Sequence, residues 1–271
     1  MNGYYFALNT KINFTQRAYS RREVCVSFQI AQISDCHLFA DKHEISYQGI
    51  NPYVSLEAVL AKVAQNGPDL VIVSGDVSAD ESLTSYQHFS HLWSQSEISA
   101  PLLVIPGNHD DLASLDKELN ASAGWPVSRS AGAYWRIHAL NTKAQGTAGA
   151  ISTNQLDYIN QQVSMNPEAH HLLVVHHHPF ACGGWMDNHS WHNSDTFVAQ
   201  VSKHQQIKAV IYGHIHHASH RQHEHCWYLS APSTCWQWAI SAQFSTSEEA
   251  PGYRVISLNN NGLVDSHIIR I

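Results

Sequence analysis

Short apolar segments of strand length alternate with longer amphipathic segments over most of the chain. Strands are predicted at residues 26–34, 70–74, 102–106, 134–140, 172–176 and 207–212, and helices at 52–67, 82–96, 112–122, 153–164 and 195–204. Regular alternation of strand and helix is typical of βαβ units, whose strands run parallel. The pattern therefore predicts an α/β fold.

The clearest helix signal lies between Asn51 and Gly67. Pro52 suits a first helical position, because its fixed φ matches the helix and its missing N–H is not needed there. Gly67 is a typical helix stop. We expect an apolar stripe made by Val54, Leu56, Val59, Leu60 and Val63.

The pattern changes after Tyr212 to short β-like pieces at residues 223–230 and 253–258. Asn261 and Gly262 have the composition of a hairpin turn leading into a strand at 264–269. These pieces predict a second sheet. Because the chain contains no internal repeat and no linker-like tract, we expect one domain at residues 25–271.

Residues 1–24 are expected to form a loosely ordered N-terminal extension. Their longest apolar run, at residues 4–8, is too short for a secretory signal, while a transit peptide stays open because the segment contains Arg and few acids. No apolar run has the length of a transmembrane helix, so we expect no membrane partner.

Histidine is unusually frequent, with 21 His against 15 Lys plus Arg. Because imidazole is the commonest protein metal ligand, this excess indicates metal binding. The formal net charge of -7 disfavours nucleic acid as a partner. An anionic substrate would then need local cations, which metal ions supply compactly.

The five cysteines, at positions 25, 36, 182, 226 and 235, form no CxxC pair. An odd number of scattered cysteines does not indicate a disulfide framework, so we expect a reducing, cytoplasmic location. Cys182 and Cys235 are interpreted as inert.

Five loops that directly follow predicted strands carry metal-ligand residue types. They are Asp35-Cys36-His37, Gly75-Asp76, Gly107-Asn108-His109-Asp110, His176-His177-His178-Pro179 and Gly213-His214-Ile215-His216. In α/β sheets, ligands bind beyond the carboxyl ends of strands, where loops distant in sequence converge. Asp oxygen with His nitrogen suits iron, manganese, zinc or cobalt. Two such ions about 3.5–4 Å apart can catalyse phosphoryl transfer. A carboxylate such as Asp76 can bridge them.

This ordered set of DxH, GD, GNHD, HxP and GHxH motifs resembles the calcineurin-like metallophosphoesterase superfamily, over nearly the whole chain after Val24. The strings HLFA at 37–40, YQHF at 86–89, VHHHP at 175–179 and APSTC at 231–235 resemble, more narrowly, bacterial class III 3',5'-cyclic-AMP phosphodiesterases. The resemblance implies a four-layer α/β/β/α sandwich with two mixed sheets.

The resemblance also implies two divalent metal ions per subunit, commonly iron and manganese. One would be held by Asp35, His37 and His216, and the other by Asn108, His177 and His214, with Asp76 between them. Within the His triplet, the HxP pattern selects His177, two residues before Pro179. His176 and His178 are then expected to hold the ligand rings in place.

The implied reaction is hydrolysis of 3',5'-cyclic AMP to 5'-AMP by a bridging hydroxide. The expected catalytic residues are His109, Asp76 and Asp110, and the expected substrate contacts are His37, Asp76, Asn108, His109 and His216. His109 would protonate the leaving 3' oxygen. Asp110 either orients His109 or caps the helix that follows.

Several alternatives stay open. Trp185, Trp191, Trp236 and Trp238 either stack on adenine or pack in the core, and residues 183–193 are a candidate lid. The substrate could be another cyclic nucleotide, phosphodiester or phosphomonoester, and the chain could instead be a non-catalytic metal-binding regulator. Both monomer and dimer are compatible with the sequence.

Overall fold

The computed structural model describes residues 27–119 and 124–271. The expected extension at 1–24 and the end of the helix predicted at 112–122 lie outside the described residues. The helices are α1 Pro52–Asn66, α2 Leu83–Gln95, α3 Leu112–Leu119, α4 Thr153–Met165 and α5 Ser194–Ser202, with the short 3-10 helices η1 Tyr47–Gly49 and η2 Trp185–His189.

Two mixed sheets form the centre of the fold. The first has the spatial order β13 Val264–Arg270, β12 Gly252–Asn259, β1 Ser27–Ile33, β2 Leu70–Ser74, β3 Leu102–Ile105. The second has the order β4 Val127–Ala131, β5 Trp135–Ala139, β6 His170–Val174, β7 Ile207–Tyr212, β9 Cys226–Ser230, β8 Ser219–His223. A small separate pair is formed by β10 Gln237–Trp238 and β11 Thr246–Ser247.

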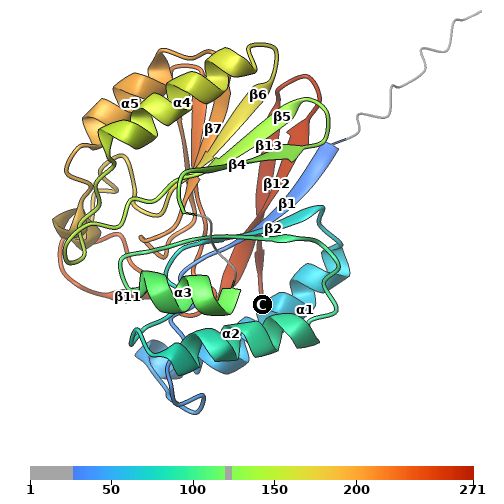
Figure 1. Ribbon diagram of the computed structural model, residues 1–271. Coiled ribbons are helices and arrows are strands. Elements are labelled where there is room, and N and C mark those ends of the chain that lie inside the picture. Colours follow the sequence, from blue (N-terminus) through green and yellow to red (C-terminus); the bar gives the residue numbers. More distant parts are fainter. Residues whose placement is uncertain (1–26, 120–123) are drawn as a thin grey trace, which may run out of the picture.

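The sheets pack face to face, and helices cover their outer faces. Figure 1 shows α1, α2 and α3 on one side of the sheets and α4 and α5 on the other. Alternate residues of each strand face opposite sides of the sheet. In β2, Ile72 packs between the sheets, while Val71 and Val73 pack under α1 and α2. This arrangement confirms the four-layer α/β/β/α sandwich.

Helix α1 has the ends that the sequence predicts. The Asn51 side chain accepts a hydrogen bond from the backbone N–H of Val54, and Gly67 ends the helix with a φ of 54°. The predicted stripe is wrong at Val54, whose side chain is 58% exposed. Val54 precedes the buried Leu56 by two residues, or about 200° around the helix, so both cannot face the sheet.

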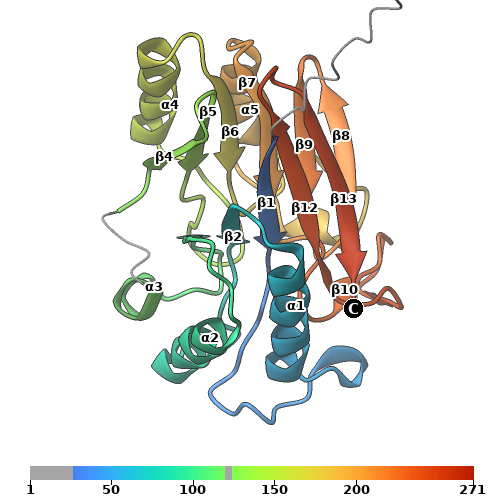
Figure 2. The ribbon, with the colours of Figure 1, turned by 90° about the vertical axis from the view of Figure 1, so that its right-hand side faces the viewer.

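The C-terminal strands join both sheets rather than forming one of their own. Strand β12 pairs antiparallel with β1, so it covers an edge of the first sheet that would otherwise lie open. The single strand predicted at 223–230 is a hairpin of β8 and β9 instead, turning at Glu224, whose φ is 51°. In Figure 2, β12 and β13 run beside β9 and β8. The turn predicted at Asn261 and Gly262 is confirmed.

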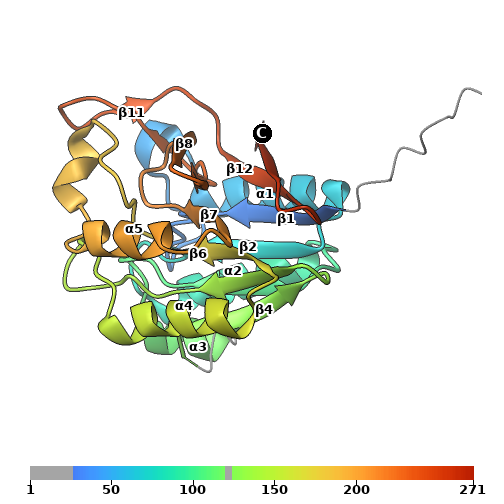
Figure 3. The same ribbon diagram turned by 90° about the horizontal axis from the view of Figure 1, so that it is seen from above.

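The strands that carry the motif loops run parallel within each sheet: β1, β2 and β3 in the first, β6 and β7 in the second. Their carboxyl ends therefore deliver five loops to one side of the sandwich. The segment containing η2, gold in Figure 3, lies there beside β11, and the N–H of Trp185 donates to the carbonyl of Ser241 over 2.7 Å. Among the described helices, none is long and apolar enough to span a membrane.

Candidate metal centre

The strand ends set the position of the metal-ligand side chains. Asp35, Asp76, His176 and His214 each lie two residues beyond the last residue of β1, β2, β6 and β7, and Asn108 lies three beyond β3. Equal offsets from strands that end at one edge bring these side chains to a similar height above the sheets. The five loops therefore converge as the sequence predicts.

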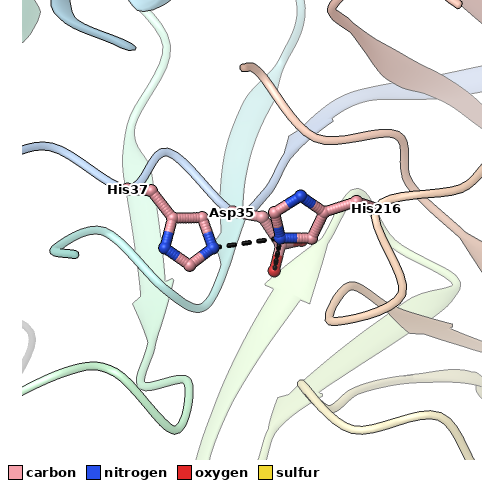
Figure 4. Close-up of side chains that lie close together, drawn as sticks. All are labelled: Asp35, His37 and His216. Carbon is pink, nitrogen blue, oxygen red and sulfur yellow. Dashed lines mark hydrogen bonds and ion pairs between the residues drawn. The ribbon is translucent and has the colours of Figure 1, made fainter. Parts of the chain in front are cut away.

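One ligand group consists of Asp35, His37 and His216 (Figure 4). The Nε2 atoms of His37 and His216 are 3.0 Å apart, and His216 Nε2 is 3.4 Å from Asp35 Oδ1. All three residues are buried. Their donor atoms are close enough to share one metal ion.

A second group lies beside it and contains Asp76, His176 and His214. His176 Nε2 is 3.1 Å from Asn108 Oδ1, which adds a neutral oxygen donor. His214 directs its Nε2 to the carbonyl of His189, at 3.1 Å, so Nδ1 is the nitrogen left for a metal. This group also has the geometry of a metal site.

Asp76 connects the two groups. Its Oδ2 is 3.8 Å from His37 Nε2 in the first group and 3.3 Å from His176 Nε2 in the second. Its other oxygen, Oδ1, accepts a hydrogen bond from the backbone N–H of His109 over 2.8 Å. Asp76 thus lies between the two groups, and its role as a bridge between metal ions stays a prediction.

The His triplet differs from the sequence-based choice. His177 is buried, but its Nδ1 contacts the Thr142 hydroxyl at 2.8 Å, and it belongs to neither ligand group. His176, which the sequence interpretation made a supporting residue, faces Asp76 instead. The geometry favours His176 as the ligand, and its offset of two residues from the strand end is the signal for it. His177 keeps a buried Nε2 without a hydrogen-bond partner among the described residues, so the choice between the two stays a prediction.

Backbone carbonyls orient the ligand rings. His176 Nδ1 is 2.8 Å from the carbonyl of Ser74, and His216 Nδ1 is 3.0 Å from the carbonyl of Trp236. Because a carbonyl only accepts, each Nδ1 donates, and the neutral ring presents a lone pair at Nε2. Each lone pair then faces a carboxylate oxygen, Asp76 or Asp35. Such crowding of electron-rich atoms is unfavourable unless a cation lies among them, so the donor set fits metal ions.

The close packing of these groups also sets the protonation states of Asp76, His176 and His37. Burial raises the pKa of Asp76, but His176 and His37 outweigh it and hold this pKa well below its ordinary value. Burial lowers the pKa of His176, but Asp76 and Asp35 raise it, to about 9. Burial and the charge of His216 lower the pKa of His37 to about 3, so this ring is neutral. Divalent metals bind ionised carboxylates and neutral imidazoles, so a metal ion here would take the place of the proton that His176 otherwise holds between Asp76 and Asp35.

Glycines make room for the ligands. A Cβ on Gly213 would lie 1.9 Å from Ser34 Oγ and 2.7 Å from Asp35 Oδ2, and one on Gly107 would lie 2.0 Å from Asp76 Oδ1. The glycine before one ligand thus leaves space for the carboxylate of another. The ligands themselves carry backbone strain, because five of them have φ between 41° and 69°: Asp35, His37, Asp76, His214 and His216.

His109 and Asp110 have separate roles. The His109 ring lies edge-on to His37, with 5.1 Å between centroids, and lines the cleft over the ligands. Asp110 is buried and accepts hydrogen bonds from the N–H groups of Gly107 and Ser78 and from the Tyr86 hydroxyl. It therefore ties two ligand loops together. Among the described residues no hydrogen bond joins Asp110 to His109, and the backbone N–H of Ser114 in α3 donates to Asp111 instead of Asp110. A catalytic role of Asp110 stays a prediction.

The cleft above the ligands has a volume of about 100 Å³. All five expected substrate contacts line it: His37, Asp76, Asn108, His109 and His216. Segment 183–193 also reaches it through Trp185, Met186 and His189, which agrees with its predicted place beside the substrate. Its movement as a lid stays a prediction.

The sequence left two alternatives for four tryptophans, stacking on adenine or packing in the core, and their positions in the structure differ. Trp185 and Trp238 line the cleft, whereas Trp191 is buried against Phe197 in the core under α5. Trp236 is buried and stacks on His37, with 5.3 Å between ring centroids.

The described cysteines, at positions 36, 182, 226 and 235, are free. Burial raises the pKa of Cys182 to about 11, and burial also raises that of Cys235. Both thiols are therefore protonated and unreactive near neutral pH, as expected.

Sequence analysis missed the role of the loop after β5. Lys143 in this loop donates from Nζ to the carbonyl of Asn108, and Thr142 holds His177. Thr147 from the same loop lines the cleft. These residues match no motif, and no local pattern points to them.

Two buried ligand groups sharing a carboxylate, at the strand ends of an α/β/β/α sandwich, define a metallophosphoesterase. The chain belongs to the calcineurin-like phosphoesterase family, which matches residues 28–218. It is 33% identical to the 3',5'-cyclic adenosine monophosphate phosphodiesterase CpdA of Escherichia coli (strain K12), over 249 residues and 90% of each chain. It is also 33% identical to the 3',5'-cyclic-nucleotide phosphodiesterase alr5338 of Nostoc, over 89% of this chain and 92% of that one.

A solved structure shares the fold. The dimetal phosphatase of Danio rerio superposes with a TM-score of 0.64 at 14% sequence identity, covering 90% of this chain and 98% of the other. At this identity the likeness concerns the fold alone.

Proposed function

We propose that this protein hydrolyses 3',5'-cyclic AMP to 5'-AMP at a two-metal centre, and so lowers cyclic AMP in the cytoplasm. The observation that carries the proposal is the position of Asp76, whose Oδ2 faces His37 of one ligand group and His176 of the other. The names of the CpdA relatives support the choice of substrate.

One metal would be held by Asp35, His37 and His216 and the other by Asn108, His176 and His214, with Asp76 placed between the two groups. We expect iron and manganese, and the nitrogen and oxygen donors also suit zinc or cobalt. When bound, the pair of ions activates a water as the nucleophile and neutralises the phosphate oxygens.

The side chains of the cleft position the substrate and move a proton. The phosphate lies among His37, Asn108 and His216, with the 3' oxygen toward His109. Attack at phosphorus opposite the 3' oxygen breaks the bond from phosphorus to that oxygen and leaves the phosphate on the 5' oxygen. His109 gives its proton to the departing 3' oxygen, an effect worth about 10²–10⁴-fold in rate.

The assay that tests this proposal compares cyclic AMP, cyclic GMP, 2',3'-cyclic AMP and an aryl phosphodiester, with purified protein loaded with manganese or iron. We expect 5'-AMP from cyclic AMP, and loss of turnover in EDTA. His109→Ala should lose at least 100-fold in kcat while keeping its metal content, and the exposed His267→Ala should behave as wild type. Hydrolysis of the aryl diester with cyclic AMP left intact would overturn the substrate assignment in favour of another phosphoester. Metal binding without any turnover would favour a regulator.

A further inference from the structure

A rim of two aromatic side chains, Tyr47 and Phe244, lies beside the cleft, because both rings contact Trp238, which lines it. Tyr47 in η1 and Phe244 between β10 and β11 are 45% and 54% exposed, although both carry large apolar rings. Their ring centroids are 5.7 Å apart. Two exposed rings in contact form an apolar patch, which on a protein surface marks a binding site.

The rim is continuous with the metal ligands. Trp238 stacks on His216, with ring centroids 5.0 Å apart and planes inclined by 24°. Tyr47 and Phe244 contact Trp238 in turn, at 5.1 and 5.4 Å. Only one indole ring therefore separates a metal ligand from the exposed rings.

Three segments distant in sequence hold the rim in place. The Gln48 side chain donates to the carbonyl of Ser247, which ties η1 to β11. Trp185, in η2, contacts Phe244 with 4.9 Å between centroids, and the backbone N–H of Trp185 donates to the carbonyl of Ser241. Packing and hydrogen bonds therefore hold the exposed rings in place before any ligand binds, which is what preorganisation of a binding site requires.

The size of the cleft indicates what the rim binds. About 100 Å³ is well below the 300 Å³ or more of a typical small-molecule site. A phosphate group fits this space, whereas a whole nucleotide does not. The remainder of the substrate extends out of the cleft, and on the side lined by Trp185 and Trp238 it meets uncharged aromatic rings.

We propose that Tyr47 and Phe244 form the nucleobase site, stacking on the base of a cyclic nucleotide whose phosphate lies at the metal centre. This inference rests on the proposed function for its substrate class. Aromatic side chains stack on the flat face of a nucleobase, which a sugar without a base lacks. Such stacking is worth about 1–3 kcal/mol per base. The rim thus distinguishes nucleotides from phosphoesters that lack a base.

The test compares cyclic AMP with 3',5'-cyclic ribose phosphate, which has the same scissile group and no base. Tyr47→Ala and Phe244→Ala should each raise KM for cyclic AMP about tenfold, with kcat nearly unchanged and with no effect on the base-free substrate. Tyr47→Phe keeps the ring and should retain the wild-type KM. Tyr134→Ala, a matched exposed tyrosine at the β4–β5 turn, serves as the control.

Failure of this inference is distinguishable from failure of the proposed function. If wild-type protein cleaves cyclic AMP and the alanine variants keep its KM, the base site is wrong and the activity stands. If wild-type protein cleaves no cyclic nucleotide, tryptophan fluorescence of the manganese-loaded protein still compares binding of 5'-AMP with ribose 5-phosphate. Equal affinity for the two would overturn the base site. A dimer that Tyr47→Ala dissociates, with KM for cyclic AMP unchanged, would instead assign the rim to a second copy of the chain.

Discussion

His176 Nε2 lies 3.3 Å from Asp76 Oδ2, whereas the adjacent His177 directs Nδ1 to Thr142. Consecutive side chains leaving a strand point in opposite directions, so only one of the two can reach the bridging carboxylate. This relationship favours His176 as the member of the triplet that belongs to the second ligand group.

Substituting the two histidines separately tests that assignment. His176→Ala should bind one metal ion instead of two, because it removes the nitrogen that faces Asp76 and Asn108. His177→Ala should keep both ions. Metal content per chain after gel filtration, measured by plasma mass spectrometry, gives the answer. The reverse outcome, with the second ion lost only from His177→Ala, would restore the assignment made from the sequence.

Gly213 is expected to tolerate no side chain. In Gly213→Ala the new methyl would meet Ser34 Oγ at 1.9 Å and Asp35 Oδ2 at 2.7 Å, so Asp35 must move away from His216. We expect weaker binding of one metal ion, by at least tenfold, measured by chelator competition. Gly132→Ala is the control, because its φ of 61° is strained for alanine but nothing lies within 4 Å. Unchanged metal affinity in Gly213→Ala would show that the loop shifts without affecting Asp35.

Asp110 should matter for stability more than for catalysis. In Asp110→Asn an amide NH₂ replaces one carboxylate oxygen and faces a buried donor, Gly107 N–H or Ser78 N–H. Leaving a buried donor unsatisfied costs about 1–3 kcal/mol, which urea unfolding would measure. Asp116→Asn, on the exposed side of α3, should change little. If kcat instead falls as far as in His109→Ala with stability unchanged, Asp110 acts on His109 after all.

The His138 ring should make the protein acid-labile. It is buried between Ser128 and His171, and burial together with the charge of His171 lowers its pKa from 6.5 to about 3. Below pH 6.5 the unfolded chain therefore takes up a proton that the folded protein does not, so the stabilising contribution is complete above pH 6.5 and is lost as the pH falls toward 3. The loss is about 1.4 kcal/mol per pH unit.

Urea unfolding at pH 7.5 and pH 5 checks this. Wild-type protein should lose about 2 kcal/mol more than His138→Gln between the two values, since one and a half pH units lie below 6.5. His267→Gln, in β13, should lose as much as wild type. A loss of equal size in all three proteins would place the acid sensitivity elsewhere.

The sequence by itself determined the elements and most of the ligands. Asn51, Pro52 and Gly67 predicted the ends of α1, because capping depends on local hydrogen bonds and φ values. The motifs at Asp35 and His214 likewise follow strands whose apolar runs are readable along the chain. Local patterns therefore predicted the α/β alternation and the loops that carry the candidate ligands, whereas the four layers followed from the family resemblance.

Tertiary structure decided the features that depend on contacts between distant segments. Which sheet receives β12 depends on the open edge of β1, more than 200 residues earlier. His176 faces Asp76 whereas His177 contacts Thr142, and Tyr47 is linked to the cleft through Trp238. Local sequence preferences do not specify which surfaces come into contact, because packing across the whole sandwich decides those contacts. The ligand types were readable in the sequence, whereas their division around Asp76 was established by the fold.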